Sequence, residues 1–244
     1  MLVNQKTAIS TSAILLVPYE AHHVTTYHQW MKDPEIQETT ASEPLTLDEE
    51  YAMQRSWRTD HDKLTFIACQ PLSKTQEDIA GMKIVVPGKD NTSDRMLGDV
   101  NLFLTPADED EEGCIGELEL MIAPTSHRRR GYGRAAILAF LCYIERHLDE
   151  ILEEYRKGVV GEGGEDGGKM KLLMLRVKIG GKNVKSIGLF EGIGFVKTDE
   201  GENYFGEVEL AFEGVVGGGR VGKLLEKFGI EGYEELGYLD HDRG

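Results

Sequence analysis

A turn of arginine and glycine residues, placed between a strand pattern and a long helix pattern, constrains the fold more than any other feature of the sequence. Residues 117–122 read as a strand, and from residue 131 to about residue 152 apolar side chains recur at helical spacing. Residues 171–179 then read as a second strand. A strand, a helix and a strand in this order predict a parallel strand pair with a right-handed crossover. We therefore expect an α/β fold.

The start of this helix pattern has the features of an anion-binding site. Gly131 and Gly133 lack the Cβ atoms that would keep a ligand away from the backbone. The first N–H groups of a helix have no partner within it, and the macrodipole places about half a positive charge there. Four arginines add positive charge around the turn: Arg128, Arg129, Arg130 and Arg134. The turn is therefore suited to binding a pyrophosphate.

Simpler interpretations of the same turn stay open. The glycines are also typical of a plain strand–helix loop, and an arginine run is also typical of a solvated surface or a weak nuclear-localisation patch. The spacing excludes two other phosphate motifs. No Gly-Lys-Ser or Gly-Lys-Thr follows, as a P-loop requires, and Ala136 stands where a dinucleotide motif places its third glycine.

The rest of the sequence predicts a mixed, mostly antiparallel sheet of six to seven strands with helices on both faces. Apolar runs predict strands at 13–17, 63–69, 79–86, 96–104 and 204–212, and the start of one at 194–197. Helical spacing predicts helices at 22–31, 46–57, 183–191 and 223–228. Thr46 and Glu49 match a capping box at the start of the second helix, and Asp33 with Pro34 should end the first.

Composition divides the chain into one domain and a tail. We expect the domain at residues 1–213, with flexible polar or glycine-rich insertions near 71–78, 88–95 and 158–168. The last insertion cannot bury enough apolar surface to order itself. Residues 214–244 read as a glycine-rich linker with a soft C-terminal tail.

The charge of the chain argues against polyanionic partners. Among its 244 residues 43 are acidic and 27 are basic, which gives a formal net charge of −16. Such a chain repels nucleic acid and anionic membranes at long range, whereas a basic peptide or an amine is compatible with it. No secretory signal or membrane-spanning apolar run is visible, so we expect a soluble, cytoplasmic protein, with the nucleus as an alternative.

The cysteines and histidines do not predict a metal site or a disulfide framework. Cys69, Cys114 and Cys142 are isolated within or beside apolar runs, which indicates buried thiols. The histidines considered as ligands have no partners at metal-ligand spacing: His22, His23, His28 and His127. We therefore expect no bound metal.

Two motifs in this order resemble the GNAT superfamily of acyl-CoA N-acyltransferases. The first is Arg128 followed by Gly131 and Gly133 after an apolar strand. The second is the run 183–195, in which an asparagine and a serine open a helix that ends in Gly-Phe. The resemblance covers most of residues 13–213 and implies the GNAT fold, with acetyl-CoA as co-substrate.

A more specific resemblance concerns the acceptor of the acetyl group. Residues 40–54 and 98–104 resemble the eukaryotic alpha/beta-tubulin N-acetyltransferase 9 family. This implies transfer to a protein or peptide amine, either an N-terminal α-amine or a lysine, with tubulin as one possible substrate.

The resemblance also implies how acetyl-CoA is held. In this family the strands at 117–122 and 171–179 splay apart, and the pantetheine arm lies between them. The backbone N–H groups of residues 129–134 bind the pyrophosphate, and a backbone N–H near Ile122 polarises the thioester carbonyl. The residues so implicated are Ile122, Arg128, Arg129, Arg130, Gly131, Tyr132, Gly133, Arg134, Asn183 and Ser186.

Two glutamates are candidates for the general base that deprotonates the amine. Glu117 and Glu119 share one face of a strand, so both side chains can face the substrate, and the resemblance implies that Glu117 stands at a base position of the family. An equally simple interpretation is that both are solvent-facing strand acids. Asp99 and Asn101 alternate with apolar residues on another strand, and either line the substrate side or lie on the surface.

One departure from the family pattern affects the acid step. Many members have a tyrosine seven residues after the asparagine of the second motif, where this chain has Phe190. Phenylalanine cannot protonate the leaving thiolate. Besides protein N-acetyltransfer, two functions stay open: a weakly catalytic or non-catalytic acetyl-CoA-binding protein that acts through a partner such as microtubules, and a small-molecule amine acetyltransferase.

Overall fold

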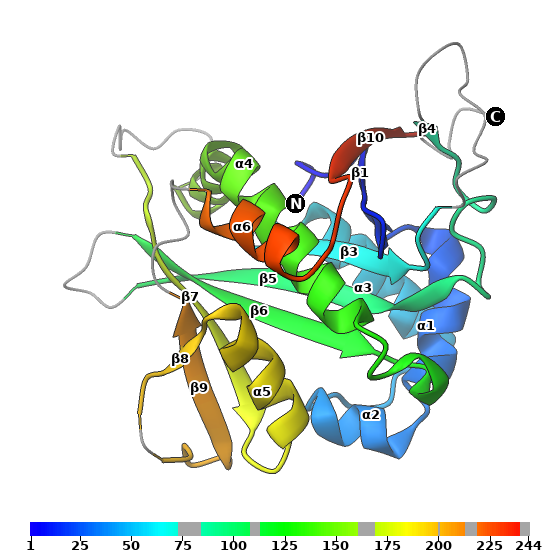
Figure 1. Cartoon of the computed structure of the whole chain (residues 1–244). Coiled ribbons are helices and arrows are strands. Elements are labelled where there is room, and N and C mark those ends of the chain that lie inside the picture. The colour runs from blue at the N-terminus through cyan, green and yellow to red at the C-terminus, as the bar shows by residue number, and fades with distance from the viewer. Residues whose placement is uncertain (73–83, 108–112, 161–168, 200, 213–218, 240–244) are drawn as a thin grey trace.

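The computed structural model of the chain describes residues 1–72, 84–107, 113–160, 169–199, 201–212 and 219–239 (Figure 1). Within these ranges the strands are β1 (Thr7–Ser10), β2 (Leu15–Pro18), β3 (Lys63–Cys69), β4 (Ile84–Val85), β5 (Met96–Pro106), β6 (Cys114–Ile122), β7 (Leu172–Gly180), β8 (Val196–Lys197), β9 (Glu207–Phe212) and β10 (Glu234–Tyr238). The helices are α1 (Val24–Trp30), α2 (Pro34–Thr39), α3 (Leu47–Thr59), α4 (Tyr132–Val160), α5 (Val184–Ile193) and α6 (Arg220–Lys227).

All described strands form one mixed sheet with the order β4-β10-β1-β2-β3-β5-β6-β7-β9-β8. Only β10–β4 and β6–β7 are parallel among the pairs in these ranges, and every other pair is antiparallel. The predicted mixed, mostly antiparallel architecture is therefore confirmed. The predicted count of six to seven strands is wrong, because the described residues contribute ten.

The extra strands come from short segments at the two ends of the chain. β1 was not predicted, and β10 lies in the segment expected to be a soft tail. The two pair with each other in antiparallel register, from Thr7 opposite Gly237 to Ser10 opposite Glu234. Four or five residues with mixed polarity give little periodic signal, so neighbours far away in sequence decide whether such segments become strands.

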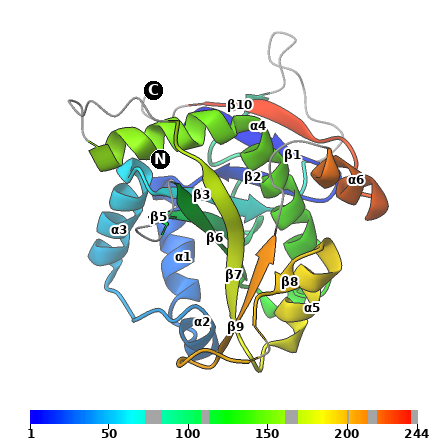
Figure 2. The ribbon, with the colours of Figure 1, turned by 90° about the vertical axis from the view of Figure 1, so that its left-hand side faces the viewer.

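The sheet separates two hydrophobic clusters, and helices cover both faces as predicted. α4, α5 and α6 contribute to the larger cluster, whereas α1, α2 and α3 pack on the opposite face (Figure 2). Cys69, Cys114 and Cys142 are buried free thiols, which confirms that prediction. None of the helices in the described ranges is both long enough and apolar enough to cross a membrane.

Local capping explains where two of the helices begin. Thr46 and Glu49 form the predicted capping box of α3: the Thr46 hydroxyl accepts from the Glu49 N–H, and the Glu49 carboxylate accepts from the Thr46 N–H at 2.8 Å. Pro34 begins α2 rather than only ending the preceding helix. Asp33 caps α2 by accepting from the Glu35 N–H at 2.9 Å, and proline is well tolerated at the first helical position.

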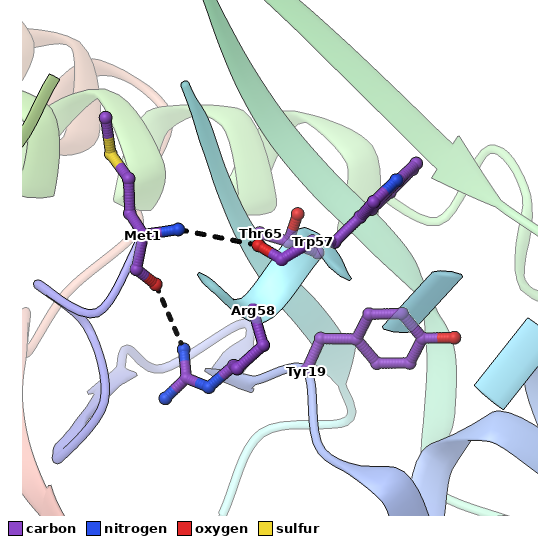
Figure 3. A pocket seen from close by; sticks show the side chains of 5 residues that line it. All are labelled: Met1, Tyr19, Trp57, Arg58 and Thr65. Carbon is purple, nitrogen blue, oxygen red and sulfur yellow. Dashed lines mark hydrogen bonds between the residues drawn. The ribbon is translucent and has the colours of Figure 1, made fainter. Parts of the chain in front are cut away.

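The amino terminus packs between the end of α3 and the start of β3. The Met1 ammonium donates to the carbonyl oxygens of Trp57, Asp60 and Lys63, and the Met1 carbonyl accepts from Arg58. Met1, Tyr19, Trp57, Arg58 and Thr65 line a cavity of about 10 Å³ (Figure 3). A space of this size holds at most one water molecule, so it is not a substrate site.

Segment 88–95, expected as a flexible insertion, is anchored to the domain in this structure. Asn91 is buried, and its Nδ2 atom lies 2.8 Å from His23 Nε2 and 3.0 Å from the Tyr238 hydroxyl oxygen. These contacts join the segment to the approach to α1 and to β10. The predicted insertions at 71–78 and 158–168 lie largely outside the described residues, as does the start of the predicted strand at 79–86.

Candidate active site

The parallel strands β6 and β7 diverge partway along their length, as the resemblance implied. Residues 114–117 of β6 pair with 172–176 of β7, and the last pair is Glu117 with Arg176. Beyond that pair β6 continues to Ile122 without bonding to β7, and Figure 1 shows the two strands separating. We call this place the fork.

The β6 backbone offers hydrogen-bonding groups to the fork. Ala123 N–H donates to Leu97 on the β5 side at 2.9 Å. Because successive residues of a strand point their N–H groups to opposite sides, the Ile122 N–H points away from β5, toward the fork. The placement agrees with the predicted role of Ile122, which itself stays a prediction.

The turn before α4 has the backbone geometry of an anion site. Arg129 and Gly131 adopt left-handed conformations, with φ of 64° and 89°, and α4 begins at Tyr132. For a residue with a Cβ such a conformation costs about 1 kcal/mol or more. Within the described residues no hydrogen bond satisfies the N–H groups of residues 129–134. The turn therefore presents several free donors at the positive end of a long helix.

The two glycines of the turn do different things. A Cβ added at Gly131 would meet nothing within 4 Å, so this glycine is needed for its positive φ. A Cβ at Gly133 would lie 3.2 Å from Leu120 and 3.3 Å from Leu189. Gly133 therefore lets the first turn of α4 pack closely on β6 and α5. Gly131 and Gly133 look alike in sequence, but Gly133 also serves the packing of the protein on itself.

The four arginines also divide into two groups. Arg128 is committed to the fold: its Nε donates to the Ile122 carbonyl at 2.9 Å, and its guanidinium also bonds to Ala123 and Glu35. The Arg134 guanidinium stacks on the ring of Phe228 at 4.2 Å.

Arg129 and Arg130 remain available to a ligand. Both are exposed, and neither has an ion-pair partner among the described residues. From the sequence all four arginines were equal candidates, because their number and spacing do not show which of them contact other parts of the protein.

The second motif forms α5 as expected. The Asn183 side chain caps the helix by accepting from the Ser186 N–H at 3.2 Å, and the helix ends at Gly194 with a φ of 101°. Phe190 is buried and meets the ring of Phe195 edge-on, with the centroids 5.1 Å apart. Phe190, which stands where many family members have a tyrosine, is thus part of the core.

The two candidate bases differ in their environment, although they share a face of β6. The Glu117 Oε2 atom lies 3.0 Å from both Arg176 Nε and Lys178 Nζ, so two cations hold this carboxylate. Glu119 is exposed and has no hydrogen bond or ion pair with any described residue. Glu119 is therefore the more accessible of the two carboxylates and the one without a partner among the described residues.

The surroundings of Glu119 suit a base that works near neutral pH. The side chain keeps contact with solvent, but the protein around it removes part of its hydration. This partial loss of hydration and the negative charges of Asp99, Glu117 and Glu207 raise the pKa of Glu119 to about 7. A group with this pKa accepts a proton readily at physiological pH.

A buried polar cluster lies beside Glu119 on the same face of the sheet. Asn101 is directly opposite Glu119 in the β5–β6 ladder, and its Nδ2 atom donates to Asp99 at 2.8 Å. The Tyr27 hydroxyl of α1 donates to the same Asp99 oxygen at 3.4 Å. Asp99 and Asn101 are both buried, so a surface role for them is wrong. Tyr27 was missed because a tyrosine on an apolar helix face normally indicates core packing.

Residues 13–196 match the family model described as "Acetyltransferase (GNAT) domain". The chain belongs to the GNAT acetyltransferase family. It is 40% identical over 231 residues to the "N-acetyltransferase 9-like protein" of Schizosaccharomyces pombe, covering 86% of this chain and 97% of that relative. It is 39% identical over 212 residues to the "Alpha/beta-tubulin-N-acetyltransferase 9" of Drosophila melanogaster, covering 86% of this chain and 88% of that relative.

Solved structures of GNAT proteins share this fold at low sequence identity. A spermidine N-acetyltransferase from Vibrio cholerae, in complex with CoA and spermine, has a TM-score of 0.55 and 17% identity over 82% of this chain and 94% of its own. RimL, a ribosomal L7/L12 alpha-N-protein acetyltransferase, has a TM-score of 0.54 and 11% identity over 84% of this chain and 94% of its own. At these identities the likeness concerns the fold alone.

As a GNAT protein the chain is an acetyl-CoA-dependent N-acetyltransferase, and the geometry fits that co-substrate. The free N–H groups of residues 129–134 suit a pyrophosphate, and Arg129 and Arg130 add unpaired positive charge. The fork exposes strand backbone that can pair with an extended amide-containing arm. When bound, acetyl-CoA supplies the acetyl group as an activated thioester.

Proposed function

We propose that this GNAT protein acetylates the α-amine of a protein N-terminus and that Glu119 is its general base. The observation that carries the proposal is the contrast along β6: Glu117 is paired with Arg176 and Lys178, whereas Glu119 is exposed beside the fork and no described cation pairs with it. A base must be able to receive the proton of its substrate, and only Glu119 of the two has that freedom.

The chemistry needs one proton removed before the new bond forms. Glu119 takes a proton from the substrate ammonium, and the neutral amine nitrogen then forms a bond to the thioester carbonyl carbon. The Ile122 N–H, directed into the fork, stabilises the negative charge that develops on the carbonyl oxygen. The carbon–sulfur bond breaks, and the remaining excess proton of the amine nitrogen leaves with the thiolate to give an amide and a free thiol.

The residues of the α4 turn orient the co-substrate for this reaction. The N–H groups of residues 129–134 bind the pyrophosphate, while Arg129 and Arg130 neutralise further phosphate charge. Asn183 and Ser186 lie at the start of α5, where they would contact the pantetheine arm. These assignments pair the free N–H donors of the turn with the co-substrate that the family uses.

The charge near the fork supports a cationic acceptor. Asp99, Glu117 and Glu207 are close enough to Glu119 to raise its pKa, so this group of carboxylates attracts an ammonium group. A protonated protein α-amine, such as that of a tubulin N-terminus, is an acceptor of this kind. The Drosophila relative is named for alpha- and beta-tubulin, and we propose tubulin as the first acceptor to test, in the cytoplasm.

One observation favours a second candidate, a protein that binds acetyl-CoA but acts mainly through a partner. Phe190 is packed in the core against Phe195, so the position of the usual tyrosine donates no proton. If the thiolate leaves slowly without that donor, tight co-substrate binding would accompany weak turnover, and contact with a partner such as microtubules would be the main activity.

Incubating the protein with acetyl-CoA and a library of N-terminal peptides, including those of α- and β-tubulin, tests these candidates. The readouts are free thiol and mass spectrometry of the peptides, for wild type and for Glu119→Gln. The proposal predicts acetylated peptides with wild type and a large loss with Glu119→Gln. Tight acetyl-CoA binding without transfer to any peptide would favour the second candidate instead.

A further inference from the structure

We infer that Asp99 is a positioning residue whose buried carboxylate keeps Glu119 basic enough to accept a proton from the incoming ammonium. The inference rests on the proposed role of Glu119 and extends it to a second carboxylate that never touches the substrate. Asp99 makes and breaks no bond: the proton moves from the ammonium nitrogen to Glu119, and Asp99 acts through its charge alone.

The place of Asp99 in the sheet makes this coupling possible. In the antiparallel ladder of β5 and β6, Asn101 is opposite Glu119 and Asp99 is opposite Met121. Asp99 and Glu119 are therefore diagonal neighbours on one face, a relationship that places side chains about 7 Å apart. At that distance two carboxylates in partly buried surroundings repel each other measurably.

The hydrogen bonds of Asp99 fix its charge in one place. Tyr27 and Asn101 both donate to Oδ2, at 3.4 and 2.8 Å, while Oδ1 is buried and has no partner among the described residues. A carboxylate in a fold is normally fully hydrogen-bonded or paired with a cation, and leaving an oxygen unpaired in the interior is costly. The cost indicates that this acid has a use beyond holding the strand.

No neighbouring cation cancels the charge of Asp99 within the described structure. The titratable and charged groups around Asp99 and Glu119 are Tyr19 between β2 and α1, Tyr27 and His28 from α1, Glu50 from α3, Glu117 from β6, Arg176 and Lys178 from β7, and Glu207 from β9. The two β7 cations are bound to Glu117, and His28 faces Glu50. Asp99 is thus a source of negative potential for Glu119 that the fold does not neutralise.

Burial raises the pKa of Asp99 itself to about 6, and the hydrogen bonds from Asn101 and Tyr27 act against this rise. Glu119, with its pKa near 7, consequently titrates while most Asp99 carboxyls are charged. The two groups titrate as a coupled pair, and removing the charge of one should make the other more acidic.

Asp99→Asn tests the inference because asparagine keeps the shape and an acceptor oxygen but removes the charge. The titration of Glu119 is followed by ¹³C NMR of the side-chain carboxyls in the full chain, without substrate. We expect its midpoint to fall by about one pH unit, the effect of a like charge about 7 Å away. Thr65→Val is the matched control, since Thr65 is buried on the same face, opposite Asn101, and carries no charge.

An unchanged Glu119 midpoint in folded Asp99→Asn would overturn the inference. If Asp99→Asn does not fold, Tyr27→Phe provides the second test. Without the Tyr27 donor, Asp99 keeps its proton to higher pH and carries less negative charge. The titration midpoint of Glu119 should therefore fall again, and an unchanged midpoint would again overturn the inference. The proposed function has a separate test. If Glu119→Gln retained full acetyl transfer, Glu119 would not be the base, but a titration shift of Glu119 measured in Asp99→Asn would still stand.

Discussion

Arg176 Nε donates a hydrogen bond to the Glu117 carboxylate at 3.0 Å, and these two residues also form the last pair between β6 and β7. The ion pair therefore stands where the two strands begin to separate. Glu119, two residues further along the same face of β6, lies beyond the last pair and has no cation partner in the part of the chain that the structure describes. On one face of β6, a glutamate that is paired with cations thus stands where the fork begins, and the next glutamate lies exposed within the fork.

The first prediction compares these two glutamates. Glu119→Gln should lower kcat by about 10² to 10⁴-fold, because the base is lost while the acetyl-CoA contacts remain. Glu117→Gln should instead lower the free energy of unfolding by ~1 kcal/mol, since it weakens a partly exposed ion pair, and it should change kcat less. Steady-state kinetics and denaturant unfolding measure the two effects. Full activity in Glu119→Gln would remove Glu119 as the base.

The second prediction concerns the pH dependence of the reaction. Glu119 must be deprotonated to accept a proton, so kcat/KM should fall on the acid side with a midpoint near pH 7. The pKa of Glu119 is raised in the folded state, so its contribution to stability decreases as pH rises through that value. A profile of kcat/KM from pH 5 to 9 measures the midpoint, and a flat profile down to pH 5.5 would contradict the assignment.

The third prediction tests the anion site at the start of α4. Gly131→Asp should weaken CoA binding by more than about tenfold, since it adds an anion where the pyrophosphate binds and strains a φ of 89°. Gly232→Asp is the matched control, because Gly232 also has a positive φ of 66° and open space around its Cα. Isothermal calorimetry with CoA measures both. Equal loss in the two variants would point to general strain instead.

The fourth prediction concerns the attachment of β10 to α4. His147 lies at a kink in α4, and its ring nitrogens lie 2.7 Å from Glu235 and 2.9 Å from Glu150. Hydrogen bonds to these carboxylates raise the pKa of His147, although burial opposes the rise. The stabilisation should be complete below pH 6.5, the ordinary His value, and disappear as pH rises through the raised pKa.

Thermal unfolding of wild type and Glu235→Gln between pH 5.5 and 8.5 measures this effect. The variant should be less stable by ~1 kcal/mol at pH 5.5 and close to wild type at pH 8.5. Destabilisation that does not change with pH would indicate that Glu235 acts only through packing.

The strand–turn–helix unit could be predicted because its signals are local. The glycines, the arginine run and the helical spacing after residue 131 predict the fold class and a candidate anion site without knowledge of distant contacts. The capping box at Thr46 and the cap at Asn183 are equally local, since each joins residues three positions apart.

The features that the sequence did not show depend on contacts between distant segments. β1 lies between β2 and β10 in the sheet, and β10, which pairs with all of its residues, follows more than 220 residues later. Arg128 and Arg130 look alike in sequence, but only Arg128 reaches Glu35 of α2. The difference between Glu117 and Glu119 likewise comes from β7, whose Arg176 and Lys178 approach only one of them.

The central claim is that this protein moves an acetyl group from acetyl-CoA to a protein α-amine. The most direct test is the rate of thiol release with two tubulin N-terminal peptides of equal sequence, one with a free α-amine and one with that amine blocked by formylation. We predict acetyl transfer to the free peptide and none above background to the blocked one. Equal rates with both peptides, or transfer to a lysine of the blocked peptide, would contradict the account.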